Sequence, residues 1–132
     1  HCGTCHQLDG KGLAKLYPGI TNSEWVNGNQ KRLIKIVLKG LWGKLEYKGF
    51  TYNGPQSTTP PMTPHGAFLS DEEVAGVLTY VRNTFDNKAK PVRPALVKKV
   101  VESVKDKTTF YMVDEILKEH PFKKWELKKV KK

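Results

Sequence analysis

The two cysteines of this chain lie three positions apart, and this spacing constrains the fold more than any other feature. Cys2 and Cys5 are followed directly by His6, in the order Cys-Gly-Thr-Cys-His, and the 132 residues contain no other cysteine. Two thiols on one turn of helix can reach the two vinyl groups along one edge of a porphyrin, and the next residue then lies beneath the iron. The motif predicts one covalent haem, attached through Cys2 and Cys5, with His6 as an axial ligand.

Two other uses of a Cys-x-x-Cys pair fit the sequence less well. A structural zinc site normally takes four ligands, whereas His65 and His120 stand alone and no further cysteine exists. A thioredoxin-like redox pair is expected within a strand–helix–strand unit, and here the glycine-rich turn Asp9-Gly10-Lys11-Gly12 follows the motif. Haem attachment is therefore the favoured interpretation.

A second axial ligand is expected from a proline-rich loop. Residues 54–66 contain four prolines, which exclude a regular element and stiffen the backbone. Met62 lies in this loop, where a rigid backbone can hold its thioether against iron, and we predict that it is the second ligand. His65 is the rival candidate. The other methionine, Met112, falls in a predicted helix and fits a core position better.

Hydrophobic periodicity predicts four helices and one β-hairpin. Apolar residues recur at helical spacing over residues 30–41, 70–85, 94–104 and 112–119. The helix at 70–85 opens on a Ser-x-x-Glu capping box, and its neighbour at 94–104 opens on a proline. Over residues 44–53 the period changes to two, which predicts the hairpin.

With these elements in order, residues 1–87 resemble a class I monohaem cytochrome c. The attachment motif is followed by Tyr17-Pro18-Gly19, a middle helix, Pro61-Met62 and a closing helix. The resemblance implies an all-α class I cytochrome c fold around one haem, here with a small β-hairpin and a C-terminal helical extension.

The resemblance also implies roles for individual residues. The backbone carbonyl of Pro18 would accept a hydrogen bond from His6 and fix its tautomer. Met62 matches the distal methionine. Tyr52 or Trp42 would donate a hydrogen bond to a haem propionate.

The implied function is electron transfer without transformation of a substrate. The protein would pass single electrons between a donor, such as a dehydrogenase or a respiratory complex, and an acceptor. Two alternatives stay open. Residues 69–73 and 77–83, with Val97-Lys98 and Phe110-Tyr111, are similar to C-terminal cytochrome modules of large secreted bacterial dehydrogenases. This similarity suggests one domain of a larger haem- or quinone-cofactor enzyme. A bis-histidine or open-site haem sensor is the other.

We expect two parts, a cytochrome c domain at 1–87 and a basic, mostly helical extension at 88–132. Class I cytochromes begin with a helix ahead of the attachment motif, but only His1 precedes Cys2. We therefore expect the domain to lack that helix, either through truncation or because residues 94–119 take over its packing. Haem attachment follows export, which predicts a periplasmic or otherwise exported protein. No run approaches the roughly 18 apolar residues of a membrane span, so membrane association would require a partner or a missing anchor.

The net charge of +10 is concentrated in the extension. Residues 1–87 contain 9 basic and 7 acidic residues, whereas residues 88–132 contain 14 and 6. Such a surface either aids solubility or docks an acidic redox partner or an anionic membrane. The docking interpretation rests on Lys31, Lys35 and Lys39 and on a lysine-rich tail at 123–132. No nucleic-acid-binding module accompanies the charge.

Overall fold

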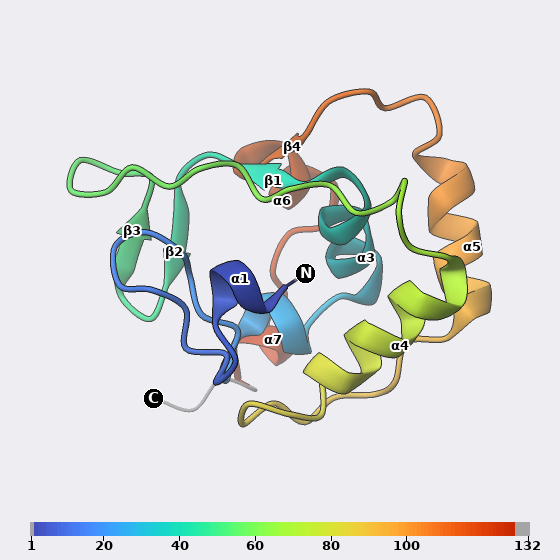
Figure 1. The fold of residues 1–132 in the computed structure, drawn as a ribbon, viewed down its shortest axis with the longest axis horizontal. Helices are drawn as coiled ribbons and strands as arrows, with labels where there is room; N and C mark the ends of the chain where they lie inside the picture. Colours follow the sequence, from blue (N-terminus) through green and yellow to red (C-terminus); the bar gives the residue numbers. More distant parts are fainter. Residues whose placement is uncertain (1, 129–132) are drawn as a thin grey trace.

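Residues 2–128 are described in the computed structural model, which Figure 1 shows as a ribbon. Helices and two small sheets alternate along this part of the chain. In chain order the elements are α1 (Gly3–His6), α2 (Glu24–Asn27), α3 (Gln30–Lys39), β1 (Leu41–Trp42), β2 (Leu45–Tyr47), β3 (Phe50–Tyr52), α4 (Asp71–Val81), α5 (Pro94–Ser103), β4 (Tyr111–Met112), α6 (Val113–Glu119) and α7 (Lys124–Lys128).

Helix α3 forms the centre of the hydrophobic core, where it packs against both α4 and α5 (Figure 1). It begins where the side chain of Asn29 accepts a hydrogen bond from the Arg32 backbone N–H, as a capping residue should. It ends at Gly40, whose φ of 86° leaves the helical region. The predicted helix at 30–41 is confirmed and is two residues shorter than expected.

Helix α4 begins at the predicted capping box. The Ser70 hydroxyl accepts from the Glu73 backbone N–H, and the Glu73 carboxylate accepts from the Ser70 N–H. The helix stops at Val81, earlier than the apolar pattern indicated. Phe85, the last residue of the predicted helix at 70–85, lies beyond the observed helix with a φ of 55°. Its ring meets Tyr80 edge-on, so the apolar repeat reflects a local ring contact there and not a further helical turn.

The predicted hairpin is confirmed, but the expectation of an all-α chain is incomplete. Strands β2 and β3 pair antiparallel through a turn at Lys48 and Gly49, both with positive φ. Strand β1 also pairs in parallel with β4, which lies far away in sequence. Periodicity did not predict this pairing, because two-residue strands are too short to show an alternation.

The extension packs onto the cytochrome c region and joins the same apolar core. Within the predicted helix at 94–104, the apolar residues Val97, Val100 and Val104 are buried, although Val101 is 39% exposed. Ile116 of α6 is fully buried in the cluster that contains α3 and α4. The boundary near residue 87 stays a prediction. Within residues 2–128, no helix is long and apolar enough to cross a membrane.

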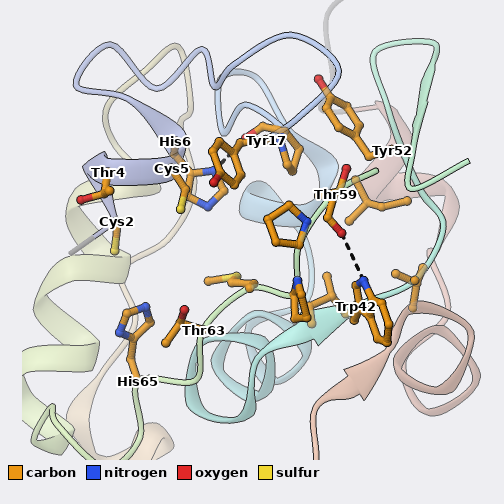
Figure 2. A pocket seen from close by; sticks show the side chains of 18 of the residues that line it. Cys2, Thr4, Cys5, His6, Tyr17, Trp42, Tyr52, Thr59, Thr63 and His65 are labelled. Atoms are coloured by element: carbon orange, nitrogen blue, oxygen red, sulfur yellow. Dashed lines mark hydrogen bonds between the residues drawn. The ribbon is translucent and has the colours of Figure 1, made fainter. Parts of the chain in front are cut away.

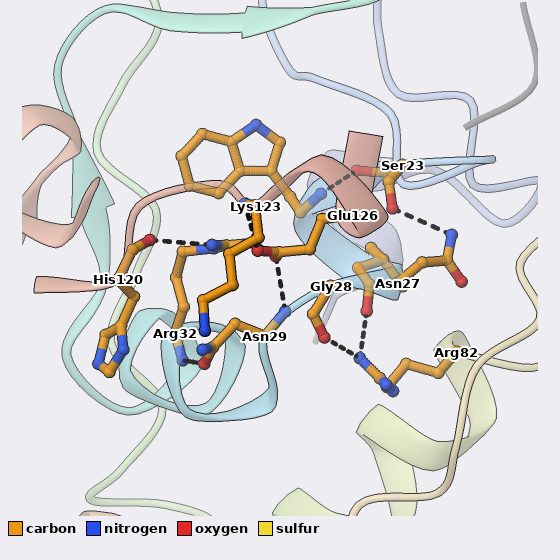
Figure 3. Close-up of polar contacts among 11 residues, drawn as sticks. Ser23, Asn27, Gly28, Asn29, Arg32, Arg82, His120, Lys123 and Glu126 are labelled. Atoms are coloured by element: carbon orange, nitrogen blue, oxygen red, sulfur yellow. Dashed lines mark hydrogen bonds and ion pairs between the residues drawn. The ribbon is translucent and has the colours of Figure 1, made fainter. Parts of the chain in front are cut away.

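Buried arginines anchor the extension through polar contacts (Figure 3). Arg32 forms an ion pair with Glu126, and both side chains are almost fully buried. Arg32 also donates to the His120 carbonyl at 2.9 Å. Arg82 donates to the carbonyls of Gly28, at 3.0 Å, and Lys90, at 2.8 Å. The Arg32 contacts join segments far apart in sequence, so the extension is held by specific bonds as well as by apolar burial.

The same packing engages part of the lysine row on α3. Lys35 pairs with Glu119 of α6 at 2.9 Å, and the Lys39 ammonium donates to the Lys107 carbonyl at 2.8 Å. Two of the three lysines expected to form a docking surface therefore hold the extension in place. Of the basic tail, residues 129–132 lie outside the described residues.

Candidate haem-binding site

A cavity of about 520 Å³ lies between α1, the loop at residues 59–65 and the β2–β3 hairpin (Figure 2). Its volume is in the range of cofactor pockets. Its lining is mostly apolar and includes Pro18, Leu41, Leu45 and Met62. Such a cavity suits a large apolar group.

The first turn of helix presents the attachment motif to this cavity. The His6 backbone N–H donates to the Cys2 carbonyl at 3.0 Å, which closes the turn. Cys2, Cys5 and His6 all line the cavity, and Figure 2 shows the two sulfur atoms on the same side of it. One helical turn therefore places two thiols and an imidazole on one wall.

The His6 ring is oriented by a backbone carbonyl. Its Nδ1 lies 2.7 Å from the Pro18 oxygen, so Nδ1–H donates and Nε2 keeps the lone pair that can bind a metal. Burial lowers the pKa of His6, and the Pro18 contact offsets this only in part. The ring is thus neutral near pH 7, which is the form that ligates iron.

A tight turn brings Pro18 under His6. The Gly12 N–H donates to the His6 carbonyl at 2.9 Å, and Gly12 has a φ of 70°. A Cβ on Gly12 would lie 2.4 Å from the Tyr17 carbonyl oxygen. Only glycine fits this conformation and this close approach. Gly12 therefore allows Tyr17, the residue before Pro18, to pack against the turn that follows His6.

Met62 lines the same cavity from the proline-rich loop. Its backbone N–H donates to the Leu41 carbonyl at 2.8 Å, which forms an isolated antiparallel bridge with β1. Thr63, the next residue, lies across the cavity from Cys5 in Figure 2. The structure thus brings the predicted thiols, imidazole and thioether around one cavity.

His65 also lines the cavity, beside Thr63 and towards Cys2 (Figure 2). Its backbone N–H donates to the Val37 carbonyl at 2.9 Å, which ties this part of the loop to α3. Burial lowers the pKa of His65. The imidazole is therefore neutral and close to the site, as the rival ligand would have to be.

The two proposed propionate donors both line the cavity, with different surroundings. The Trp42 indole N–H donates to the Thr59 carbonyl at 3.1 Å, which braces the loop (Figure 2). The Tyr52 hydroxyl has its pKa raised by burial and by Tyr47, so it stays a protonated donor. Their contacts with a propionate stay predictions.

Sequence reasoning missed several cavity-lining residues, and the one farthest from the predicted site in sequence is Val113. Val113, at the start of α6, contributes to the wall although it lies in the extension. The apolar run at residues 110–113 was visible in the sequence. Nothing in that run indicated which part of the fold it would contact.

The profile of the cytochrome c family matches residues 1–85, and the chain belongs to this family. It has the class I cytochrome c fold, and its cofactor is one covalently bound haem c. The residues present fit this group, because two thiols, a neutral imidazole and a thioether surround an apolar cavity. Proteins of this family carry electrons and do not transform a substrate.

Two curated relatives are both named cytochrome c-552, and both come from Thermus thermophilus. The first is 32% identical over 105 residues, covering 75% of this chain and 75% of the relative. The second, from a particular strain of that species, is 32% identical over 105 residues, covering 75% of this chain and 66% of the relative. Three quarters of 132 residues is 99, which exceeds the 85 residues of the family match. The similarity to these relatives therefore reaches into the extension.

Proposed function

We propose that this protein is an electron carrier whose haem is attached to Cys2 and Cys5 and ligated by His6 and Met62. The observation that carries the proposal is the 2.7 Å contact from His6 Nδ1 to the Pro18 carbonyl, in a cavity that Met62 also lines. The haem supplies reversible one-electron chemistry when bound. The chain supplies the attachment, the ligand geometry and a mostly apolar cavity wall.

The protein residues limit how much the site rearranges when an electron arrives or leaves. Pro18 fixes the orientation of His6, and the Leu41 carbonyl fixes the backbone at Met62. Because both ligands are held by backbone contacts outside the iron, both oxidation states can keep the same ligands. That suits rapid transfer between partners and does not suit binding of a substrate.

His65 is the second candidate for the distal position, because it lines the same cavity. Ligation by His65 would give a low-potential bis-histidine carrier, since thioether ligation raises the potential relative to imidazole. The backbone N–H groups of both residues are fixed, Met62 to Leu41 and His65 to Val37. Met62 is favoured because it matches the distal methionine of the cytochrome c family, whose profile covers this loop.

The partners and location also belong to the proposal. A net charge of +10 suits an acidic redox partner, such as a dehydrogenase or a component of a respiratory chain. Covalent haem attachment fits a protein exported to the periplasm or a similar compartment.

Attachment through Cys2 and Cys5 is tested by extraction with acidified acetone. Thioether bonds survive this treatment, so the haem colour should stay with the polypeptide of the wild type. Cys2→Ser and Cys5→Ser together should release it. Release from the wild type would contradict the assignment of the two cysteines.

Ligation by Met62 is tested on the ferric protein by its weak near-infrared sulfur-to-iron charge-transfer band. Met62→Ala should abolish the band and lower the reduction potential, because a thioether favours ferrous iron. His65→Ala is the matched control and should leave both unchanged. A wild type without the band, with His65→Ala shifting the potential, would assign the distal position to His65.

A further inference from the structure

The C-terminal extension reaches the haem cavity itself. Val113 lines that cavity and is 7% exposed. It lies well beyond residue 85, where the family match ends. Part of the wall of the proposed redox site is thus built from a segment beyond the family-profile match.

A continuous backbone ladder connects this segment to Met62. The Met62 N–H donates to the Leu41 carbonyl at 2.8 Å, and Leu41 is paired in parallel with Tyr111. The Tyr111 N–H donates to the Gly40 carbonyl at 3.1 Å. Strand β1 therefore lies between the Met62 segment and β4, and it cannot shift without disturbing both.

Strand β4 is itself firmly held. Tyr111 is 3% exposed, and the Phe110 ring meets Trp42 edge-on at 6.5 Å between centroids. The Glu115 carboxylate accepts from the Met112 N–H at 3.1 Å and pairs with Lys107 at 2.8 Å. These contacts fix β4 and the first turn of α6 behind the cavity wall.

We propose that β4 and Val113 are positioning elements of the redox site, which hold the Met62 segment through β1. A loop opens locally at a frequency set by its packing and hydrogen bonds. Removing support behind β1 should populate states in which the Met62 thioether has left the iron. This inference rests on the proposed ligation by Met62, and it assigns to the extension a role in the site beyond the stability of the fold.

The test compares two valine truncations in the full-length haem-loaded protein. Val113→Ala removes two methyl groups at the cavity wall, and Val100→Ala removes the same groups from the buried face of α5, away from the cavity. Imidazole is the probe, since it binds the iron only when Met62 leaves. Its apparent affinity scales with the population of that open state, so Val113→Ala should bind imidazole about three- to tenfold more tightly than the wild type.

Val100→Ala should lose at least as much resistance to urea but keep the imidazole affinity of the wild type. Val113→Ala should also weaken the sulfur-to-iron band. Phe110→Ala is a second variant, because Phe110 is 37% exposed and its truncation leaves most of the core intact. It should raise the imidazole affinity in the same direction, and it carries the test if Val113→Ala does not fold.

The outcomes separate this inference from the proposed function. If the wild type shows the sulfur-to-iron band but Val113→Ala and Val100→Ala change the imidazole affinity equally, the positioning role is overturned. The ligation by Met62 then still holds. A wild type without the band overturns the ligation and the positioning role together. A selective change in Val113→Ala or Phe110→Ala supports the inference.

Discussion

Arg32 shows how a single charged residue can be held inside this fold. Its side chain is fully buried and pairs with Glu126, which is 1% exposed. Glu126 also accepts from the backbone N–H groups of Asn29 and Lys123, at 2.9 Å each. The guanidinium also lies 4.2 Å from the centroid of the Phe122 ring. The Glu126 carboxylate is compensated by Arg32 and by backbone N–H donors, and the Arg32 guanidinium by Glu126 and the His120 carbonyl, so the loss of either side chain leaves an unpaired buried ion.

Glu126→Gln should therefore be strongly destabilising. Leaving Arg32 buried without its carboxylate is expected to cost about 3–5 kcal/mol in the free energy of unfolding, measured in urea. Glu119→Gln is the matched control, because its pair with Lys35 is partly exposed. That change should cost about 1 kcal/mol or less. Equal losses of stability in the two variants would show that breaking the buried Arg32–Glu126 pair costs no more than breaking a partly exposed pair.

The same carboxylate predicts a pH dependence. Burial alone would raise the pKa of Glu126, but hydrogen bonds from Arg32 and from two backbone N–H groups outweigh it, and the net shift is downward from 4.5. A group with a lowered folded pKa contributes stability above its unfolded pKa and loses it as pH falls through the folded value. The wild type should lose this stability below about pH 4.5, and Glu126→Gln should show a shallower loss there. If the free energy of unfolding falls with pH in parallel for the wild type and Glu126→Gln, the loss of stability does not come from protonation of Glu126.

At the scale of elements, the junction between α3 and β1 is the most constrained. Gly40 has a φ of 86°, and a Cβ there would lie 2.4 Å from the Met62 carbonyl oxygen and 3.1 Å from the Phe110 ring. The helix end, the distal segment and the extension meet at this residue. Only glycine accommodates all three.

Gly40→Ala should disturb the distal ligand as well as the stability. The positive φ alone costs roughly 1–2 kcal/mol for a residue with a Cβ, and the clash with Met62 adds to it. Gly49→Ala is the control, because Gly49 has a φ of 78° with nothing within 4 Å of its Cβ. Gly49→Ala should lose only the stability that the positive φ costs, and it should keep the sulfur-to-iron band. If Gly40→Ala keeps the sulfur-to-iron band and is as stable as Gly49→Ala, the close approach of Gly40 to the Met62 carbonyl does not constrain Met62.

At the scale of the whole molecule, the structure redefines which charges are available to a partner. Lys35 and Lys39 are engaged by the extension, whereas the side chains of Lys123 and Lys124 are exposed. The tail cannot simply be removed to test steering, since a chain ending at His120 would also lose Glu126. The charges must be changed one by one on the intact fold.

We expect the basic C-terminal region to speed association with an acidic redox partner. Lys123→Gln with Lys124→Gln should slow association at low ionic strength and flatten its salt dependence, since long-range attraction is screened beyond about 8 Å at physiological salt. Lys98→Gln with Lys99→Gln on α5 removes the same charge elsewhere. Association is measured by stopped-flow electron transfer. If the two double variants slow it equally, the association rate depends on the net charge and not on where the lysines lie.

The sequence by itself determined the local features of this protein. The attachment motif, the Asn29 and Ser70 helix caps, Pro94 at the start of α5 and the hairpin turn are each set by residues within a few positions of one another. Their physics is therefore readable from the chain alone. The resemblance added Pro18 and Met62, because the family pattern relates distant segments that periodicity cannot relate.

Only the tertiary structure decided which distant segments meet. The pairing of β1 with β4, the Arg32–Glu126 ion pair and the place of Val113 in the cavity wall each join residues separated by most of the chain. A short apolar run or a single buried charge can be satisfied by many partners, and packing of the whole core selects one of them. For this reason the extension could be predicted as helical and basic from its sequence, whereas its place behind the haem cavity could not.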